Sequence, residues 1–417
     1  MPSHVNPFRS FLRRFGSGGA IVLSFVVAFE ILIMISPFAL LFYSFFNPVL
    51  LALNSSPLTR WLTAFFLPHM TVPHDRFLII LRILGSVLLI GGTTGFIVCA
   101  AQIYLGRIFS PGIATLGLYG ILRHPQYTSL ALAAMGLAIM WPRFLTLVLF
   151  GVMLFLYYVL SRDEERRMAA QYGEAYVAYR NRTGMFLPRP VESIFVQVGG
   201  YKGNTPYFRI VAGFAFLCVV FVSIGFTLRG YTIRSLPMVR VDSVDVVCIS
   251  PVDASIAATL LPAILADSAV RTRMPKPGDD PNRRVLAYFL PVDFVMQGMI
   301  ANTGDEWKLY EQHATIKMIV DYIMHPFSHL TRGHAEHQGG TMRPREMYAM
   351  NAMKRRVIFV EIQGDGRPLA SKEDDFRIND SREPLFFVDV HLHTADILQV
   401  QDTPSGTGWG AVPTPMF

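Results

Sequence analysis

Long apolar runs are the sequence feature that most restricts the fold of this chain. A helix needs about 20 consecutive apolar residues to cross the roughly 30 Å hydrocarbon core of a bilayer. Two of these runs, residues 127–141 and 144–160, are short and are joined by a tight turn at Trp141-Pro142-Arg143. The sequence therefore predicts an all-α multi-pass membrane bundle with about five spans. The candidate spans are residues 20–46, 77–105, 127–141, 144–160 and 208–228.

The composition agrees with a membrane protein. Hydrophobic residues make up 52% of the chain and charged residues 16%, whereas a soluble domain carries about 25% charged residues. This excludes a disordered chain and an ordinary soluble enzyme. Residues 1–229 hold 18 Lys and Arg against 7 Asp and Glu, whereas residues 230–417 hold 19 against 23. Basic residues that flank apolar spans suit the lipid bilayer better than nucleic acid, so no nucleic-acid partner is expected.

The basic residues also predict an orientation. Arginines cluster before the first span and in residues 106–124 and 162–206, and the positive-inside rule places these segments in the cytoplasm. Five crossings then place residues 230–417 outside the cytoplasm, although Arg229 and Arg234 argue mildly against this. Residues 47–75 are expected to form an interfacial segment or a short re-entrant helix. If they cross the membrane fully, the number of crossings becomes even, and residues 230–417 fall on the cytoplasmic side.

The C-terminal part, residues 230–417, is predicted to be a soluble α+β domain of unknown function. The domain boundary is accordingly placed between residues 229 and 230. A helix is expected over residues 306–324. Strands are expected over residues 241–249, 285–292, 357–362 and 385–393.

Polar groups that carry chemistry are concentrated around the short helical pair. Arg123 and His124 precede residues 127–141, and Glu164 and Glu165 follow residues 144–160. Because a helical hairpin returns to the membrane face from which it started, these four side chains are expected to lie near one another. We expect this cluster at the cytoplasmic mouth of the bundle.

The segment after the hairpin is amphipathic, because Met168, Tyr172, Tyr176 and Tyr179 recur at helical spacing. Carboxylates suit a cation or a ribose diol, Arg and His suit a carboxylate, and tyrosine rings suit a purine. S-adenosyl-L-methionine contains a sulfonium cation, a ribose diol, a carboxylate and a purine, so it fits all of these side chains. A nicotinamide nucleotide fits less well, because the two acidic residues would meet its phosphates.

These motifs form an ordered set that resembles the isoprenylcysteine carboxyl methyltransferase and phospholipid methyltransferase superfamily. The pattern is GxYxxxRHPxY, a short hairpin, EExxLxxxFGxxYxxY and a final LP, and it occupies the region 111–190. In this chain it is carried by Gly117, Tyr119, Arg123, His124, Pro125, Tyr127, Glu164, Glu165, Met168, Tyr172, Gly173, Tyr176, Tyr179, Leu187 and Pro188.

The resemblance implies an integral membrane methyltransferase that uses S-adenosyl-L-methionine and acts on a lipid or lipidated acceptor, by carboxyl O-methylation or headgroup N-methylation. It implies no metal. The loop at residues 111–114 would lie along the cofactor. The implied catalytic residues are Arg123, His124 and Glu165, of which Glu165 or His124 would take the proton of an amine acceptor. The implied cofactor-binding residues are Gly117, Tyr119, His124, Pro125, Gln126, Tyr127, Glu164 and Tyr176.

Two departures from the family pattern bear on the substrate. Ser129 stands where a glycine is common, and Leu160 stands where members acting on prenylcysteine carry an arginine. The second departure argues against a prenylcysteine acceptor. One alternative is a membrane sterol-type reductase using NADPH, which the pair Glu164-Glu165 disfavours. Another is a membrane-anchored binding or scaffold protein with a degenerate methyltransferase core.

Seven of the eleven histidines lie in the C-terminal part. The set His325, His329, His334 and His337 has partly metal-like spacing, and His391 and His393 fall on one face of a strand. Metal binding by some of them is one interpretation. Solvated or locally hydrogen-bonded histidines are the favoured one, because a proline and a glycine interrupt the first set.

Overall fold

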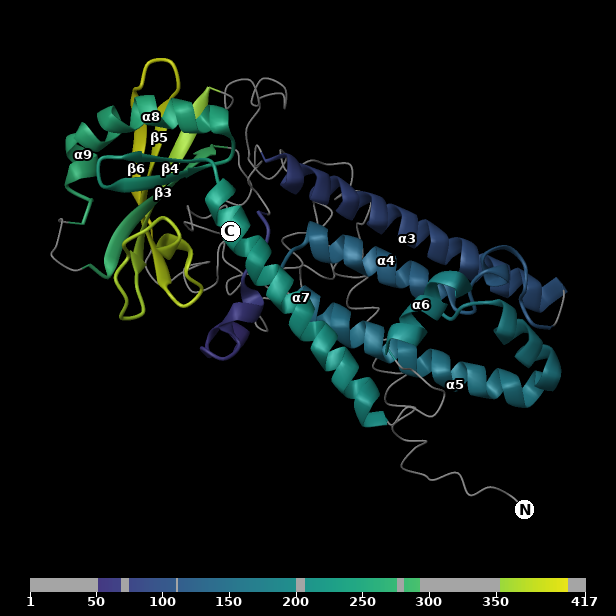
Figure 1. Ribbon diagram of the computed structural model, residues 1–417. Coiled ribbons are helices and arrows are strands. Elements are labelled where there is room, and N and C mark those ends of the chain that lie inside the picture. Colours follow the sequence, from purple (N-terminus) through teal and green to yellow (C-terminus); the bar gives the residue numbers. More distant parts are fainter. Residues whose placement is uncertain are drawn as a thin grey trace, which may run out of the picture. The chain divides into compact units, whose positions relative to one another are not determined.

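The computed structural model describes residues 52–68, 75–109, 112–199, 207–275, 281–292 and 353–403 (Figure 1). The chain divides into two compact units, which are described separately. The helical unit contains residues 80–224, and the sheet unit contains the described parts of 30–79 and 225–417. The division falls within α7, after Ile224, and the domain boundary predicted at residue 229 stays a prediction.

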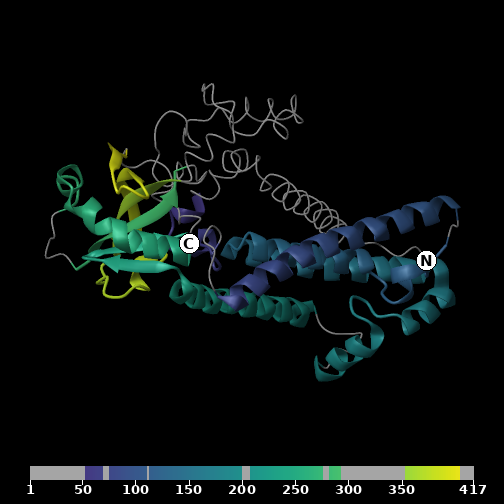
Figure 2. The same cartoon turned by 90° about the horizontal axis from the view of Figure 1, so that it is seen from above.

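Helices α3, α4 and α5 of the helical unit lie side by side in both views (Figures 1 and 2). Three of the helices, α3, α5 and α7, are long and apolar enough to cross a membrane. The elements of the helical unit are, in chain order, α3 (Arg76–Phe109), η2 (Gly117–Gly120), α4 (Pro125–Met140), α5 (Phe144–Arg182), α6 (Arg189–Gly199) and the first part of α7 (Tyr207–Ser235).

The expectation of about five spans is therefore corrected to three for the described residues. The predicted span at residues 127–141 is found as α4, but its 16 residues reach only about 24 Å at 1.5 Å per residue. That length is shorter than a bilayer core. The predicted span at residues 20–46 lies outside the described residues.

Two glycines let α3 and α4 approach closely. A Cβ on Gly92 would lie 2.4 Å from the backbone nitrogen of Ala133, and one on Gly136 would lie 2.4 Å from that of Leu89. Helices in membranes commonly associate through small residues, because backbones in contact gain dispersion energy that lipid does not offer. This packing fixes α3 as a support for the loop that precedes α4.

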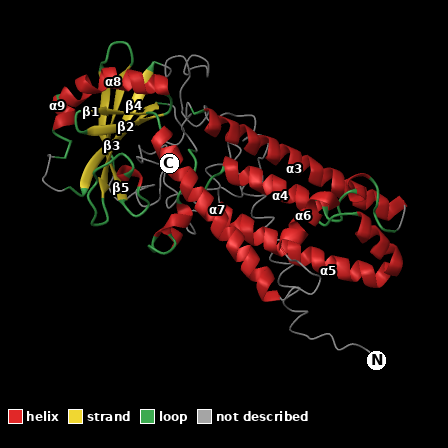
Figure 3. Ribbon diagram, in the orientation of Figure 1, coloured by secondary structure: helices red, strands yellow, loops and turns green. Residues whose placement is uncertain are grey.

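The sheet unit has six strands in the order β1-β2-β3-β4-β5-β6. Figure 3 draws the strands in yellow and the helices in red. Strands β2 and β3 are parallel and the other neighbours are antiparallel. The mixed sheet confirms the predicted α+β class, and the four predicted strands are found as β2 to β5. The strands are β1 (Met238–Val241), β2 (Val244–Cys248), β3 (Arg283–Pro291), β4 (Lys354–Gln363), β5 (Ser381–His391) and β6 (Ile397–Asp402).

The parallel pair requires a crossover, which α8 (Pro251–Ala266) and α9 (Ser268–Arg271) supply. Ser250 caps α8 by accepting a hydrogen bond from the Asp253 N–H, and Pro251 takes the first helical position. Both faces of the sheet are buried. One packs on α8, and the other packs on the end of α7 and on the loop between β4 and β5. The helix predicted over residues 306–324 lies outside the described residues.

Residues 52–68 also belong to the sheet unit. They include the short helix η1 (Arg60–Thr63), and Phe65 is fully buried. The guanidinium of Arg229 donates hydrogen bonds to the carbonyls of Phe65 and Phe376, the latter at 2.7 Å. Arg60 donates to the carbonyl of Asn379 at 2.9 Å. Three segments far apart in the sequence are thus joined by arginine-to-carbonyl bonds.

Candidate active site

The loop before α4 is held from α3. The side chain of Gln102 donates a hydrogen bond of 2.5 Å to the carbonyl of Leu116. The next residue, Gly117, has a φ of +58°, and a Cβ there would lie 3.1 Å from Oε1 of Gln102. Glycine at this position is therefore favoured by both conformation and space. The turn leads into η2 and brings Tyr119 into the interior.

Tyr119 connects the loop before α4 to α4 and to α5 through hydrogen bonds. Its side chain is 4% exposed, and its hydroxyl donates a 2.6 Å hydrogen bond to Oε1 of Gln126. Its carbonyl accepts a 2.7 Å hydrogen bond from the hydroxyl of Tyr179. Burial, followed by neighbouring charges, raises the pKa of Tyr119 well above its usual value, so the phenol stays protonated. Two predicted cofactor residues, Tyr119 and Gln126, therefore bond to each other.

A short backbone ladder closes the site. The N–H of Arg123 donates to the carbonyl of Gly184 at 2.8 Å, and the N–H of His124 donates to that of Met185 at 3.1 Å. The N–H of Met185 in turn donates to the carboxylate of Glu192 at 2.5 Å. The beginning and the end of the sequence motif are thus aligned by main-chain bonds, and α6 supplies an acidic anchor.

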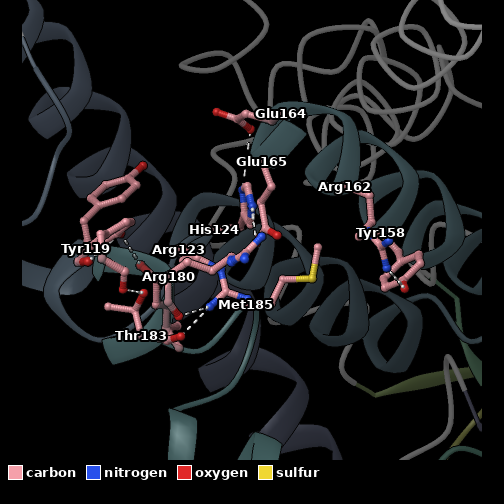
Figure 4. A network of polar contacts seen from close by, with 12 residues as sticks. Tyr119, Arg123, His124, Tyr158, Arg162, Glu164, Glu165, Arg180, Thr183 and Met185 are labelled. Carbon is pink, nitrogen blue, oxygen red and sulfur yellow. Dashed lines mark hydrogen bonds and ion pairs between the residues drawn. The ribbon is translucent and has the colours of Figure 1, made fainter. Parts of the chain in front are cut away.

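His124 lies between two carboxylates at the start of α4 (Figure 4). Its Nδ1 is 3.5 Å from Oε2 of Glu164, and its Nε2 is 3.6 Å from Oε1 of Glu165. The residue is 2% exposed. Burial lowers the pKa of His124, but the carboxylates of Glu164 and Glu165 raise it, and the net pKa is above its usual value. The arrangement favours an imidazolium.

Arg123 neutralises one of these carboxylates. Its Nε lies 2.5 Å from Oε1 of Glu165, and both side chains are 11% exposed. Its Nη1 donates to the carbonyls of Arg180, at 3.1 Å, and Thr183. The guanidinium thus ties the loop to both ends of the amphipathic part of α5. Glu164 differs from Glu165, because 39% of its side chain is exposed.

The remaining predicted residues surround this cluster. Pro125 is the first residue of α4, and Tyr127 stacks on Tyr157 with ring centroids 4.9 Å apart. Tyr176 is buried, with its ring centroid 5.9 Å from that of Tyr179. Arg162 points away from His124 and donates to the hydroxyl of Tyr158 at 3.1 Å (Figure 4).

The structure thus brings together Arg123, His124, Glu164 and Glu165, which are the four side chains expected to meet across the hairpin. Gln102 and Glu192 support the site but were not predicted. Gln102 is the one amide side chain in the apolar run of α3, which could have drawn attention to it. Glu192 lies beyond the motif, and no sequence pattern pointed to it.

Metal ligands are not gathered in the described part of the chain, where no three His, Cys, Asp or Glu side chains could hold an ion. His391 and His393 are neighbours, with ring centroids 6.1 Å apart. The set from His325 to His337 lies outside the described residues, as does Pro111 of the predicted cofactor loop.

The hairpin region matches a known protein family. Residues 80–175 match the phospholipid methyltransferase family. The match confirms the resemblance inferred from the motif and covers less than half of the chain. It includes the Arg123-His124 pair and the Glu164-Glu165 pair. No curated protein and no solved structure matches the chain.

Proposed function

We propose that the helical unit is an integral membrane methyltransferase that uses S-adenosyl-L-methionine and methylates the headgroup amine of a lipid. The observation that carries this proposal is the position of His124 between Glu164 and Glu165, at 3.5 and 3.6 Å, within a segment matching the phospholipid methyltransferase family. The family match supports methyl transfer in a membrane, and the site geometry supports the residue roles given below.

The residues present fit the proposed cofactor. S-adenosyl-L-methionine supplies an electrophilic methyl group on a sulfonium when it is bound. Glu164 contacts His124 through Oε2 and is 39% exposed, so its carboxylate can accept hydrogen bonds from a ligand. We assign cofactor binding to Glu164, and the shape of the adenosine pocket to Tyr127 and Tyr176. Tyr119 contributes its ring alone, because its hydroxyl is bonded to Gln126.

The network also supports a division between catalytic and positioning residues. An amine acceptor must lose a proton before it attacks the methyl carbon. The raised pKa of His124 favours the protonated imidazole, and Arg123 forms an ion pair with Glu165. We therefore assign proton acceptance to Glu164, and we treat Arg123, His124 and Glu165 as positioning residues. Most of the rate enhancement would then come from holding the reactants in line.

The acceptor is proposed from two observations. The matched family is named for phospholipid methylation, and Leu160 occupies the position at which prenylcysteine-directed members carry arginine. A lipid could approach sideways, because α3 exposes apolar side chains such as Ile80, Val87 and Ile97. A headgroup amine at the membrane surface would reach the exposed side of Glu164.

We further propose a cytoplasmic site. The segment from Arg162 to Arg189 holds six arginines against four acidic residues and adjoins the site. Helix α7, which follows this segment, is long and apolar enough to cross a membrane. If it crosses once, the residues after α7 would lie on the opposite side of the membrane. The test introduces one cysteine at a time, as Glu174→Cys or Asp396→Cys, and measures its reaction with an impermeant thiol reagent added outside the cytoplasm. We expect only Asp396→Cys to react.

Glu164→Gln tests the function. We expect at least about a tenfold loss of S-adenosyl-L-methionine affinity, because a charged hydrogen-bond acceptor is lost, together with loss of labelled methyl transfer to membrane lipids. The matched control is Glu174→Gln, which changes an exposed glutamate farther along α5. Calorimetric titration of the purified protein provides the affinity, with NADPH titrated in parallel. Unchanged affinity in Glu164→Gln, or binding of NADPH alone, would contradict the proposal.

A further inference from the structure

Helix α6 turns its acidic side chain toward the protein and its apolar side chains outward. The carboxylate of Glu192 accepts a 2.5 Å hydrogen bond from the N–H of Met185. Ile194 lies two residues farther on, roughly 200° around the helix, and is 59% exposed. Val191, about one turn before Ile194, is 42% exposed. A surface helix of a soluble protein places its apolar side inward, so the outward side of α6 is suited to an apolar environment.

Hydrogen bonds fix this orientation of α6. The N–H groups of Val191 and Glu192 donate to the carbonyl of Pro188 at 2.9 and 3.0 Å, which closes the first turn on the preceding loop. Oε2 of Glu192 lies close to that loop, because a Cβ on Gly184 would be only 2.6 Å from it. Rotation of the apolar side inward would therefore break the hydrogen bond between Glu192 and Met185.

Basic residues accompany this apolar side. Glu192 is the one carboxylate among residues 180–194, and it is bonded to the Met185 N–H. Leu187 adds apolar surface just before α6, since it is 41% exposed. Apolar side chains next to cationic ones are typical of a segment that lies in the interface of an anionic bilayer. The exposed basic residues of this segment are Arg180, Arg182 and Arg189.

The neighbouring helices place α6 near a membrane surface. It lies in the chain between α5 and α7, both of which are long and apolar enough to cross a membrane. Its 11 residues reach only about 16 Å, which is too short to span a bilayer. Eight peptide steps lead from Gly199 to Tyr207 at the start of α7, a distance of at most about 30 Å. Helix α6 is therefore tied closely to the end of a candidate span.

We propose that α6 and the loop before it dock on the surface of a bilayer that contains anionic lipids. Val191 and Ile194 would enter the upper part of the acyl chains, and the three arginines would lie among the phosphate groups. The occupant is lipid, because the apolar side chains lie beside cationic ones and next to a candidate span. The proposal depends on the membrane assignment of α7 and is independent of methyl transfer.

The experiment uses the full chain in nanodiscs, with a fluorophore attached to Ile194→Cys. Labelled Asp396→Cys, at an exposed position between β5 and β6, is the control. The unsubstituted chain, labelled in parallel, gives the background from its own three free cysteines. Lipids with a nitroxide on the acyl chain quench probes that reach that depth. We expect at least about twofold stronger quenching at Ile194→Cys than at Asp396→Cys, because interfacial helices bury their apolar side in the acyl boundary.

Phosphatidylserine tests the electrostatic part of the proposal. Its addition to phosphatidylcholine nanodiscs should raise the quenching at Ile194→Cys by about half or more, and high salt should remove this increase by screening. Replacement of Arg180, Arg182 and Arg189 together by glutamine should also remove it. The matched control makes the same change in net charge at three exposed arginines of the sheet unit, Arg271, Arg283 and Arg367.

Three results would overturn the proposal. The first is quenching at Ile194→Cys no stronger than at Asp396→Cys. The second is a probe that is shielded from aqueous iodide without being quenched by the nitroxide lipid, which would assign the face to a second copy of the chain or to another protein. The third is an effect of phosphatidylserine that is absent, or that persists in the variant of Arg180, Arg182 and Arg189. None of these readouts depends on methyl transfer, so a failure here is distinguishable from a failure of the proposed function.

Discussion

At the scale of the residue, one buried ion pair accounts for much of the site geometry. Arg123 and Glu165 are each 11% exposed and 2.5 Å apart. The approach of these groups could be predicted, because a hairpin returns its two ends to one place. The different roles proposed for Glu164 and Glu165 could not be predicted, since they depend on the exposure of the two side chains, which is 39% for Glu164 and 11% for Glu165. The hydrogen bond from Tyr119 to Gln126 depends likewise on side-chain rotamers that no spacing rule specifies.

Arg123→Gln is predicted to destabilise the helical unit by about 3 kcal/mol, because the buried Glu165 would lose its direct ion pair and keep only the more distant His124, at 3.6 Å. Calorimetric unfolding in detergent gives the change. Arg166→Gln, at a side chain that is 77% exposed, should change the stability by no more than about 1 kcal/mol. If the two variants unfold alike, the ion pair does not have the structural role assigned to it.

A second residue-scale prediction concerns Asp375, which is fully buried 3.0 Å from Arg284. Burial raises the pKa of Asp375 to about 6, against the opposing effect of Arg284. The folded state therefore keeps a proton that the unfolded state loses near pH 4. Stability from this group is present at low pH and is lost as the pH rises through about 6, by roughly 2–3 kcal/mol.

Asp375→Asn keeps a neutral side chain of the same shape and should remove this part of the pH dependence. The measurement is the difference in unfolding temperature between wild type and variant from pH 4 to pH 7. We expect the variant to gain relative stability as the pH rises. A difference that stays constant across this range would show that Asp375 does not titrate there.

At the scale of the element, length and periodicity explain which predictions succeeded. The strands β2 to β5 were found because each contains a short apolar run that is buried in the sheet. Helix α8 was missed because it is apolar on nearly all sides, so no helical period was visible, although Ser250-Pro251 marked its start. Strand β6 was missed because it is an edge strand with mixed exposure and few apolar residues.

The packing of α3 on α4 yields a test with a neighbouring control. In Gly92→Ala the new methyl would lie 2.4 Å from the backbone nitrogen of Ala133, whereas Gly91 has open space. Gly92→Ala should cost about 1–3 kcal/mol through overpacking, and Gly91→Ala should be neutral or stabilising by up to about 1 kcal/mol. Unfolding temperatures and methyl transfer should fall together in the first variant alone. Equal effects would show that α3 and α4 are not in backbone contact.

At the scale of the whole molecule, the division of the chain does not follow the order of the sequence. Apolar runs predicted a membrane part followed by a soluble part. The structure instead places residues 52–68, which precede α3, within the sheet unit. Hydropathy could not show this, because a short segment of mixed polarity resembles a membrane-surface segment until its partners are known. The partners are contributed by Arg229 and by the loop at Phe376.

This arrangement predicts that Arg229→Met weakens the sheet unit without affecting cofactor binding. Arg229 is 6% exposed and donates hydrogen bonds to carbonyls of two distant segments. Its replacement by methionine would remove both of these hydrogen bonds. The expected cost is about 3 kcal/mol, seen as a lower unfolding temperature for one of two calorimetric transitions. Arg234→Met, at an exposed position five residues later on α7, should leave both transitions unchanged. A loss of S-adenosyl-L-methionine affinity in Arg229→Met would contradict this prediction and would show instead that the stability of the sheet unit affects ligand binding by the helical unit.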